Sequence, residues 1–290
     1  MPQTRRWWSV DLFLAGWLGA TAALLLLFRN RIPNAGWIAA GHLLALAAYL
    51  GAKRVAARNK GLLAVYLMSP FLLVLGIFQA MGLILPHLRG RTADAALAEW
   101  DVRLFGSDPT RWLEGHLGPG WAGLLQYLYL TYYVIFVVVA VALWRRTRGR
   151  VFLSCSGALI GCLLTTYLGY YLVPAHGPRT YLQYDTPLPL EGAAAGIHRA
   201  LDHLEYIKLD AFPSGHTALS VFNLLLLFRM GSFLRWYLVL PVLGVIVSTV
   251  VLRYHYAIDV LAGLLCTLLW FPWGLRLTRW IDTPRRHHEA

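Results

Sequence analysis

Long apolar stretches recur along the whole sequence and constrain the fold more than any other feature. A helix needs about 20 mostly apolar residues to cross a hydrocarbon core about 30 Å thick. Hydrophobic residues make up 58% of the chain and charged residues 14%, a balance typical of membrane proteins. We therefore predict an all-α integral membrane protein, a polytopic helical bundle of about eight spans. The predicted spans are 8–28, 36–52, 61–86, 121–144, 151–174, 212–228, 234–252 and 256–275.

The first apolar stretch is predicted to be a retained span and not a removable signal peptide. Asp11 interrupts its start, and no small-residue cleavage pattern follows Leu27. The three cysteines, Cys155, Cys162 and Cys266, fall inside predicted spans without metal-ligand spacing. They therefore give no information about the compartment.

The net charge of +12 raises the question of a nucleic-acid partner. The basic residues lie instead in short clusters between apolar stretches, where orientation signals belong, so we predict a membrane partner and no nucleic acid. These clusters place both termini in the cytoplasm of a multi-pass cell-membrane protein. Arg29 and Arg31 do not fit this orientation, because they flank the predicted outer turn after the first span. The clusters are Arg5 and Arg6; Lys53, Arg54, Arg58 and Lys60; Arg145, Arg146, Arg148 and Arg150; Arg229 and Arg235; and Arg276, Arg279, Arg285 and Arg286.

Two long connections, 87–120 and 175–211, are predicted to lie on the extracytoplasmic side. The segment 99–113 mixes charges and aromatic residues, which suits either a helix at the membrane interface or a plain surface helix. Ten of the fourteen acidic residues lie in the two connections, in agreement with this orientation: Asp94, Glu99, Asp101, Asp108, Glu114, Asp185, Glu191, Asp202, Glu205 and Asp210.

Three segments beside the outer ends of predicted spans concentrate polar groups. The first, Pro174–Thr180, contains Arg179, whose planar donor fork suits phosphate oxygens. Taken alone, this arginine is explained better by contact with lipid headgroups.

The second polar segment, Ala211–Thr217, opens the sixth predicted span. Pro213 is tolerated in the first turn of a helix, Gly215 lets the backbone approach a ligand, and the free amides of that turn can bind an anion. Ser214 can add a hydroxyl donor, and His216 can give a proton to a departing alkoxide. The alternative is an ordinary turn followed by a structural histidine.

The third polar segment, Ser248–Asp259, contains Arg253 and lies where the seventh span turns into the eighth. Ionisable groups so close to hydrocarbon are costly, and function is the default explanation. His255 and Asp259 are four residues apart, so a helix can place them on one face. The carboxylate can then fix the tautomer of His255 and leave its other nitrogen as a nucleophile. The alternative is a structural His–Asp pair.

The predicted topology brings all three segments to the same outer face. Two histidines, two arginines and the start of a helix can then meet over one phosphate, where positive charge stabilises the transferring group. The sequence lacks His-Glu-x-x-His, Cys-x-x-Cys and acidic clusters, so we expect no metal and no other cofactor.

At these residues the chain resembles the type 2 phosphatidic acid phosphatase (PAP2) superfamily. Its second motif, Pro-Ser-Gly-His, is intact at 213–216, and its third motif matches at Ser248, His255 and Asp259. The resemblance implies that His255 forms a phosphohistidine, that Asp259 orients it and that His216 protonates the leaving group. It also implies a PAP2-like core.

Two departures from the family motifs concern the arginines. Thr249 stands where the third motif has arginine, and Arg253 follows four residues later. In the first motif, Leu172 stands in place of lysine, and Pro178 precedes Arg179 instead of following it. Together with the segment 101–109, these features look more like the branch that contains inositol phosphorylceramide synthases, which transfer a headgroup between lipids. The resemblance covers roughly residues 95–275.

We accordingly predict three regions: a three-span region at 1–94, the PAP2-like core at 95–275 and a basic cytoplasmic tail at 276–290. The predicted activity is a lipid phosphatase or phosphotransferase that acts on a lipid phosphate or phospholipid at the extracytoplasmic face. The phosphate-binding residues would be Arg179, Ser214, Gly215 and Arg253. A transporter or flippase that only binds the phosphate, and an inactive relative, are the alternatives. The oligomeric state is left open.

Overall fold

The computed structural model of the chain describes residues 6–88, 90–147, 149–204 and 207–283. Helices dominate it, and the predicted all-α class is confirmed. The chain divides into two compact units, which are described separately. Five charged residues from the clusters and connections above lie outside the described residues: Arg5, Arg148, Glu205, Arg285 and Arg286.

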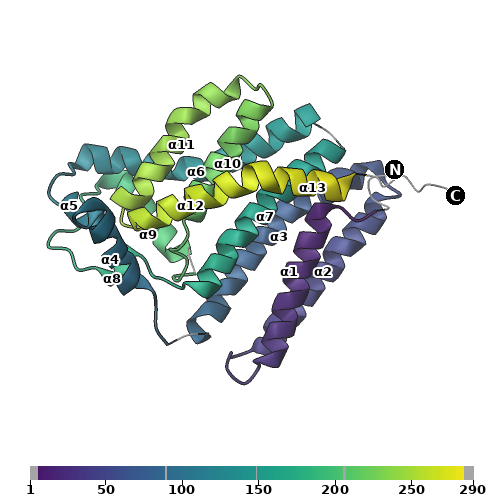
Figure 1. Cartoon of the computed structure of the whole chain (residues 1–290), viewed down its shortest axis with the longest axis horizontal. Helices are drawn as coiled ribbons and strands as arrows, with labels where there is room; N and C mark the ends of the chain where they lie inside the picture. The colour runs from purple at the N-terminus through teal and green to yellow at the C-terminus, as the bar shows by residue number, and fades with distance from the viewer. Residues whose placement is uncertain (1–5, 89, 148, 205–206, 284–290) are drawn as a thin grey trace. The chain divides into compact units, whose positions relative to one another are not determined.

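The first unit comprises residues 1–77, 143–164 and 269–290. Figure 1 shows α1 (Ser9–Leu27) and α2 (Ala35–Ala56) as an antiparallel pair within it. The other elements with residues in this unit are η2 (Lys60–Leu62), α3 (Leu63–Ile84), α6 (Pro119–Thr147), α7 (Arg150–Leu172), η4 (Trp270–Gly274) and α13 (Leu275–Asp282).

Two buried carboxylates in the first unit, Asp11 and Asp282, have partners within that unit. Asp11 accepts hydrogen bonds from the hydroxyls of Tyr49, at 2.6 Å, and Tyr66, at 2.8 Å, and it also pairs with Lys53. Asp282 accepts from the Ser9 amide at 2.7 Å. Because a buried charge is tolerated only when it is paired, these partners explain how acidic residues persist in apolar helices.

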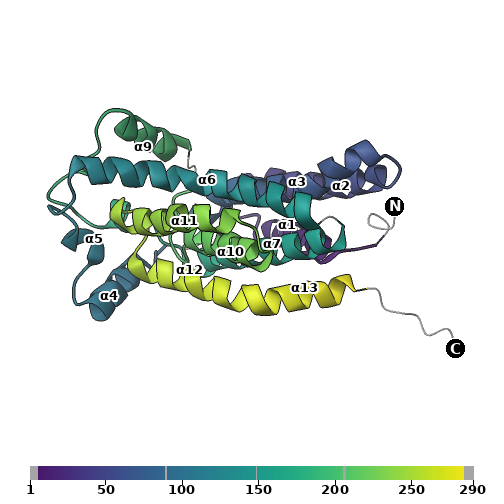
Figure 2. The ribbon, with the colours of Figure 1, turned by 90° about the horizontal axis from the view of Figure 1, so that it is seen from above.

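The second unit comprises residues 78–142 and 165–268 and holds all of the predicted site residues. Figure 2 shows α9 beside the first half of α6, and the Ala194 side chain lies 3.8 Å from where a Cβ on Gly123 would be. Besides parts of α3, α6 and α7, the unit contains η3 (Leu85–His87), α4 (Asp94–Phe105), α5 (Pro109–Trp112), α8 (Pro178–Tyr181), α9 (Gly192–Leu204), α10 (Gly215–Arg229), α11 (Leu234–Val251) and most of α12 (Ala257–Leu269).

Seven helices of the described chain are long and apolar enough to cross a membrane. They correspond to seven of the eight predicted spans. The sixth predicted span forms α10, which has only 15 residues and is shorter than a hydrocarbon core requires. The last predicted span ends later than expected, because α12, η4 and α13 follow one another without a break as far as Asp282.

Carboxylates of the segment 94–108 organise the loops of the second unit. Asp94 accepts hydrogen bonds from the amides of His176, at 3.0 Å, and Gly177, at 2.9 Å. Asp101 accepts from the amides of Ala257, at 2.8 Å, and Ile258, at 2.7 Å, at the start of α12. Both carboxylates are fully buried. Asp94 and Asp101 of α4 therefore hold the first and the third polar segments in place. Of the two, only Asp101 belongs to the segment 99–113.

Candidate active site

The two candidate catalytic histidines face each other in the second unit. His216 lies in the first turn of α10, and His255 lies in the turn between α11 and α12. His216 Nδ1 is 3.3 Å from His255 Nε2, and the two rings are nearly edge to face. The structure thus brings together residues from the second and third polar segments.

The hydrogen bonds through these two histidines run in one direction, from the Tyr129 hydroxyl through His216 and His255 to the Ala211 carbonyl. His255 Nδ1 lies 2.7 Å from the carbonyl oxygen of Ala211, and a carbonyl can only accept, so Nδ1 carries the proton. In the neutral ring, Nε2 of His255 then bears the lone pair, and Nδ1 of His216 donates to it. His216 Nε2 is left to accept from the Tyr129 hydroxyl at 2.9 Å. This tautomer directs the unprotonated nitrogen of His255 at the proton of His216.

Asp259 lies beside His255 but is not its nearest acceptor. One carboxylate oxygen of Asp259 is 3.5 Å from His255 Nδ1 and accepts from the Tyr256 amide at 2.8 Å. The other oxygen is buried and has no hydrogen-bond partner among the described residues. The Ala211 carbonyl therefore fixes the tautomer of His255, whereas the charge of Asp259 can balance positive charge on the ring.

Ser214 and Gly215 shape the start of α10. The Ser214 hydroxyl accepts from the Thr217 amide at 3.3 Å, which makes Ser214 the N-cap residue. A Cβ on Gly215 would lie 2.6 Å from the Tyr170 hydroxyl, and one on Gly263 of α12 would lie 2.4 Å from the Ser214 carbonyl oxygen. The absence of a side chain at Gly215 serves helix packing as well as access to the backbone.

Arg179 lies above the aromatic residues next to the histidines. Its guanidinium is 4.6 Å from the ring centroid of Tyr254, and Tyr254 stacks on Tyr129 at 4.6 Å. Its backbone amide donates to the Arg253 carbonyl at 2.9 Å, which ties α8 to the turn that carries His255. The guanidinium also pairs with Asp202 of α9 at 2.5 Å. The first polar segment therefore joins the other two, with Arg179 engaged by a carboxylate.

Arg253 has a different environment. Its guanidinium donates twice to the Thr186 carbonyl at 3.1 Å, lies 3.5 Å from the ring centroid of Tyr184 and is 3.8 Å from a carboxylate oxygen of Glu114. Its backbone adopts a left-handed conformation, with φ of 65°, which is unusual for a residue with a side chain. In this structure the side chain therefore holds the loop around Thr186.

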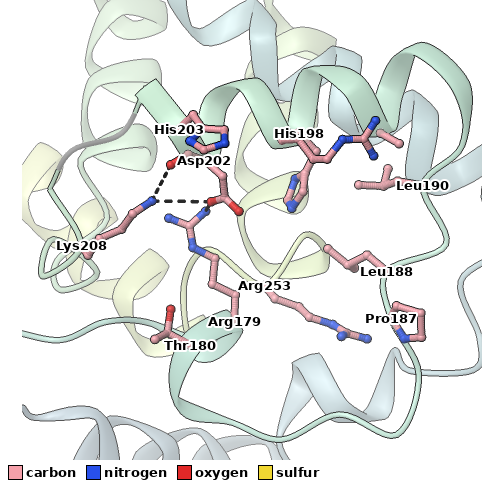
Figure 3. Close-up of a pocket in the computed structure, with 12 residues that line it drawn as sticks. Arg179, Thr180, Pro187, Leu188, Leu190, His198, Asp202, His203, Lys208 and Arg253 are labelled. Carbon is pink, nitrogen blue, oxygen red and sulfur yellow. Dashed lines mark hydrogen bonds and ion pairs between the residues drawn. The ribbon is translucent and has the colours of Figure 1, made fainter.

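A cavity of about 710 Å³ lies over this region, a size suited to a small ligand or a polar headgroup. Figure 3 shows the Arg179 and Arg253 side chains pointing to different sides of it, with Asp202 and Lys208 beside Arg179. The walls are rich in cationic and imidazole groups, with Asp202 as the acidic member of the lining. The lining side chains are mostly polar: Arg179, Thr180, His198, Arg199, Asp202, His203, Lys208 and Arg253.

Sequence reasoning missed three residues of the site. Tyr129 belongs to a tyrosine-rich stretch of the fourth predicted span, where aromatic residues are explained equally well by an interfacial belt. In the sequence, Asp94 and Asp101 stand out only by their charge in an outer connection and, for Asp101, by its place in the segment 101–109. Their bonds join residues more than 80 positions apart, so no local pattern could reveal their partners.

Fold and site together define a class of protein. The chain is a polytopic helical membrane protein, and the start of a short helix places a histidine against the histidine of a turn between two helices, with the buried Asp259 carboxylate beside the second histidine.

Comparison with known proteins gives the family. A family model described as the PAP2 superfamily matches residues 96–273, more than half of the chain, and the chain belongs to this superfamily. It is 25% identical over 267 aligned residues to a PA-phosphatase related-family protein of Dictyostelium discoideum, covering 72% of this chain and 46% of that protein. The chain thus spans about half the length of this curated relative. No solved structure matches it. The family predicted from the sequence is confirmed.

Proposed function

We propose that the chain is a lipid phosphatase or phosphotransferase that acts on a lipid phosphate or phosphodiester at the extracytoplasmic face of the membrane. The observation that carries the proposal is the facing pair of ring nitrogens, His255 Nε2 and His216 Nδ1, at 3.3 Å. One nitrogen has the lone pair that a nucleophile needs, and the other has the proton that a leaving group needs.

In the first step, His255 Nε2 attacks phosphorus and forms a P–N bond while the bond from phosphorus to the leaving oxygen breaks. His216, protonated on both nitrogens when a phosphate dianion is bound, gives its Nδ1 proton to that oxygen. His255 keeps its Nδ1 proton and donates it in a hydrogen bond to the Ala211 carbonyl, so the phosphorylated ring is cationic. The Asp259 carboxylate, 3.5 Å away, stabilises this charge.

In the second step, water or an alcohol attacks phosphorus and the P–N bond breaks. His216, now neutral, takes the proton of the attacking hydroxyl. Water gives free phosphate, and an alcohol gives a new phosphate ester, so one intermediate serves both a phosphatase and a phosphotransferase. Arg179 would bind the equatorial oxygens through these steps.

A substrate panel tests the proposal. Purified protein is offered lipid phosphates and phospholipids with and without alcohol acceptors, and free phosphate and new lipids are measured. We expect turnover that resists a metal chelator and is inhibited by vanadate. In reconstituted liposomes, movement of a phosphorylated lipid without release or transfer of phosphate would instead support the transporter.

The Asp202→Asn variant should strengthen substrate binding. Asp202 holds Arg179 at 2.5 Å and Lys208 at 3.7 Å, and a substrate phosphate must replace it as the partner of Arg179. Because Asp202 is about half exposed, the pair is weak, and removing the carboxylate should lower KM roughly two- to fivefold, equivalent to about 0.4–1 kcal/mol. Initial rates over a range of lipid phosphate concentrations measure this.

The matched control is Glu191→Gln, which removes the same charge from an exposed position outside the cavity lining. A similar fall in KM for both variants would mean that net charge, and not the Arg179 pair, is responsible. A rise in KM for Asp202→Asn would show that the carboxylate assists binding.

A further inference from the structure

Tyr129 of α6 lies outside the family motifs, yet its side chain forms a hydrogen bond with one histidine of the catalytic pair. Its hydroxyl is 2.9 Å from His216 Nε2, the ring nitrogen that faces away from His255. The side chain is fully buried, and its ring packs on Tyr254 at 4.6 Å and against His216 at 5.0 Å. The hydroxyl therefore has a fixed position relative to His216.

The chemical character of the hydroxyl matters because the proposed cycle changes the charge of His216. In the resting site, neutral His216 has a lone pair on Nε2 and needs a donor there. The charged ring has an Nε2 proton and needs an acceptor, and so does the neutral ring that remains when Nδ1 has given its proton away. A carbonyl could serve only the forms with an Nε2 proton, and an amide N–H only the resting form. A tyrosine hydroxyl both donates and accepts, so it can partner both forms by rotating.

We propose that Tyr129 is the positioning residue of the general acid: its hydroxyl holds the ring of His216 and satisfies Nε2 both with and without a proton on that nitrogen. This inference rests on the proposed function of the site. Tyr129 itself exchanges no proton with the substrate. It keeps His216 Nδ1 aimed at the leaving oxygen and stabilises the charged ring where burial would disfavour it.

The aromatic packing connects this role to phosphate binding. Tyr254 stacks on Tyr129 with an interplanar angle of 12° and also lies under the Arg179 guanidinium. The Tyr254 hydroxyl is held at 2.9 Å by His198 Nδ1. The residue that orients the acid and the residue that binds the phosphate therefore pack on the same ring.

Tyr129→Phe tests the proposal because it keeps the ring and removes only the hydroxyl. With a lipid monophosphate, we expect kcat to fall roughly 10- to 100-fold, part of the usual contribution of a general acid. We also expect the alkaline limb of the kcat/KM profile to move to lower pH, because the charged form of His216 loses an acceptor. Tyr132→Phe is the control, since Tyr132 has only ring contact with His216, at 4.6 Å, among the described residues. Its kcat should stay within about threefold of the wild type.

A double-mutant cycle with His216→Ala separates this role from a structural one. If Tyr129 acts through His216, Tyr129→Phe should cause no further loss of kcat in the His216→Ala background. Equal losses in both backgrounds, or an unchanged pH profile in the single variant, would overturn the role of Tyr129. Absence of turnover by the wild-type protein on every lipid offered would overturn the proposed function instead.

Discussion

Replacing His255 with Gln should abolish turnover while the protein still inserts into the membrane and folds. The ring supplies the atom that bonds to phosphorus, and an amide cannot form the same intermediate. Loss of a nucleophile that acts together with other catalytic groups usually costs about a thousandfold or more in kcat. The measurement is phosphate release or transfer from a lipid phosphate, with size-exclusion profiles in detergent to verify folding.

His116→Gln provides the control for this substitution. His116 is exposed, follows α5 by four residues and stacks on Trp112 at the end of that helix. Its replacement should leave turnover unchanged. Acid-labile, alkali-stable labelling by a phosphate donor should occur in the wild type and disappear with His255→Gln. Substantial residual turnover in the His255 variant would refute the phosphohistidine route.

Replacing Asp101 with Ala should destabilise the protein and disrupt the site, although Asp101 touches neither histidine. The carboxylate accepts from two amides at the start of α12, and the substitution leaves both without their partner. Burial raises the pKa of Asp101, and the two hydrogen bonds oppose this rise. A buried donor left unsatisfied costs about 1–3 kcal/mol. Two such donors are exposed to this cost, and water can enter part of the space that the side chain leaves in the variant. We therefore expect the free energy of unfolding to fall by about 2–4 kcal/mol and the melting temperature by roughly 5–15 °C.

Glu99→Ala on the same helix is the matched control. Glu99 forms an exposed ion pair with Arg103, and such pairs contribute 1 kcal/mol or less. Thermal unfolding in detergent should therefore show a small shift for Glu99→Ala and a large one for Asp101→Ala. Comparable shifts would mean that helix α4 as a whole, and not the Asp101 carboxylate, supports the start of α12.

The sequence alone was enough for the class of fold and the family. Apolar stretches of membrane length predict helices wherever they occur, because unpaired backbone groups are too costly in hydrocarbon. The motif at 213–216 is a run of four residues, and His255 and Asp259 are four positions apart, so each is a local pattern. The exception among the spans was α10, which starts at Gly215, after Pro213 and the N-cap Ser214, and is therefore shorter than its apolar stretch suggested.

Tertiary structure decided which groups meet. The sequence suggested that Asp259 holds the ring of His255, but the nearest acceptor is the Ala211 carbonyl, a backbone atom that no residue pattern can reveal. It suggested that Arg253 binds the phosphate; the structure adds that this side chain, which lines the cavity, donates to the Thr186 carbonyl. The partners of Asp101, Tyr129 and Arg179 come from distant parts of the chain. Contacts of this kind depend on how helices pack, whereas membrane spans and motifs depend on neighbouring residues, so only the latter can be predicted from the sequence.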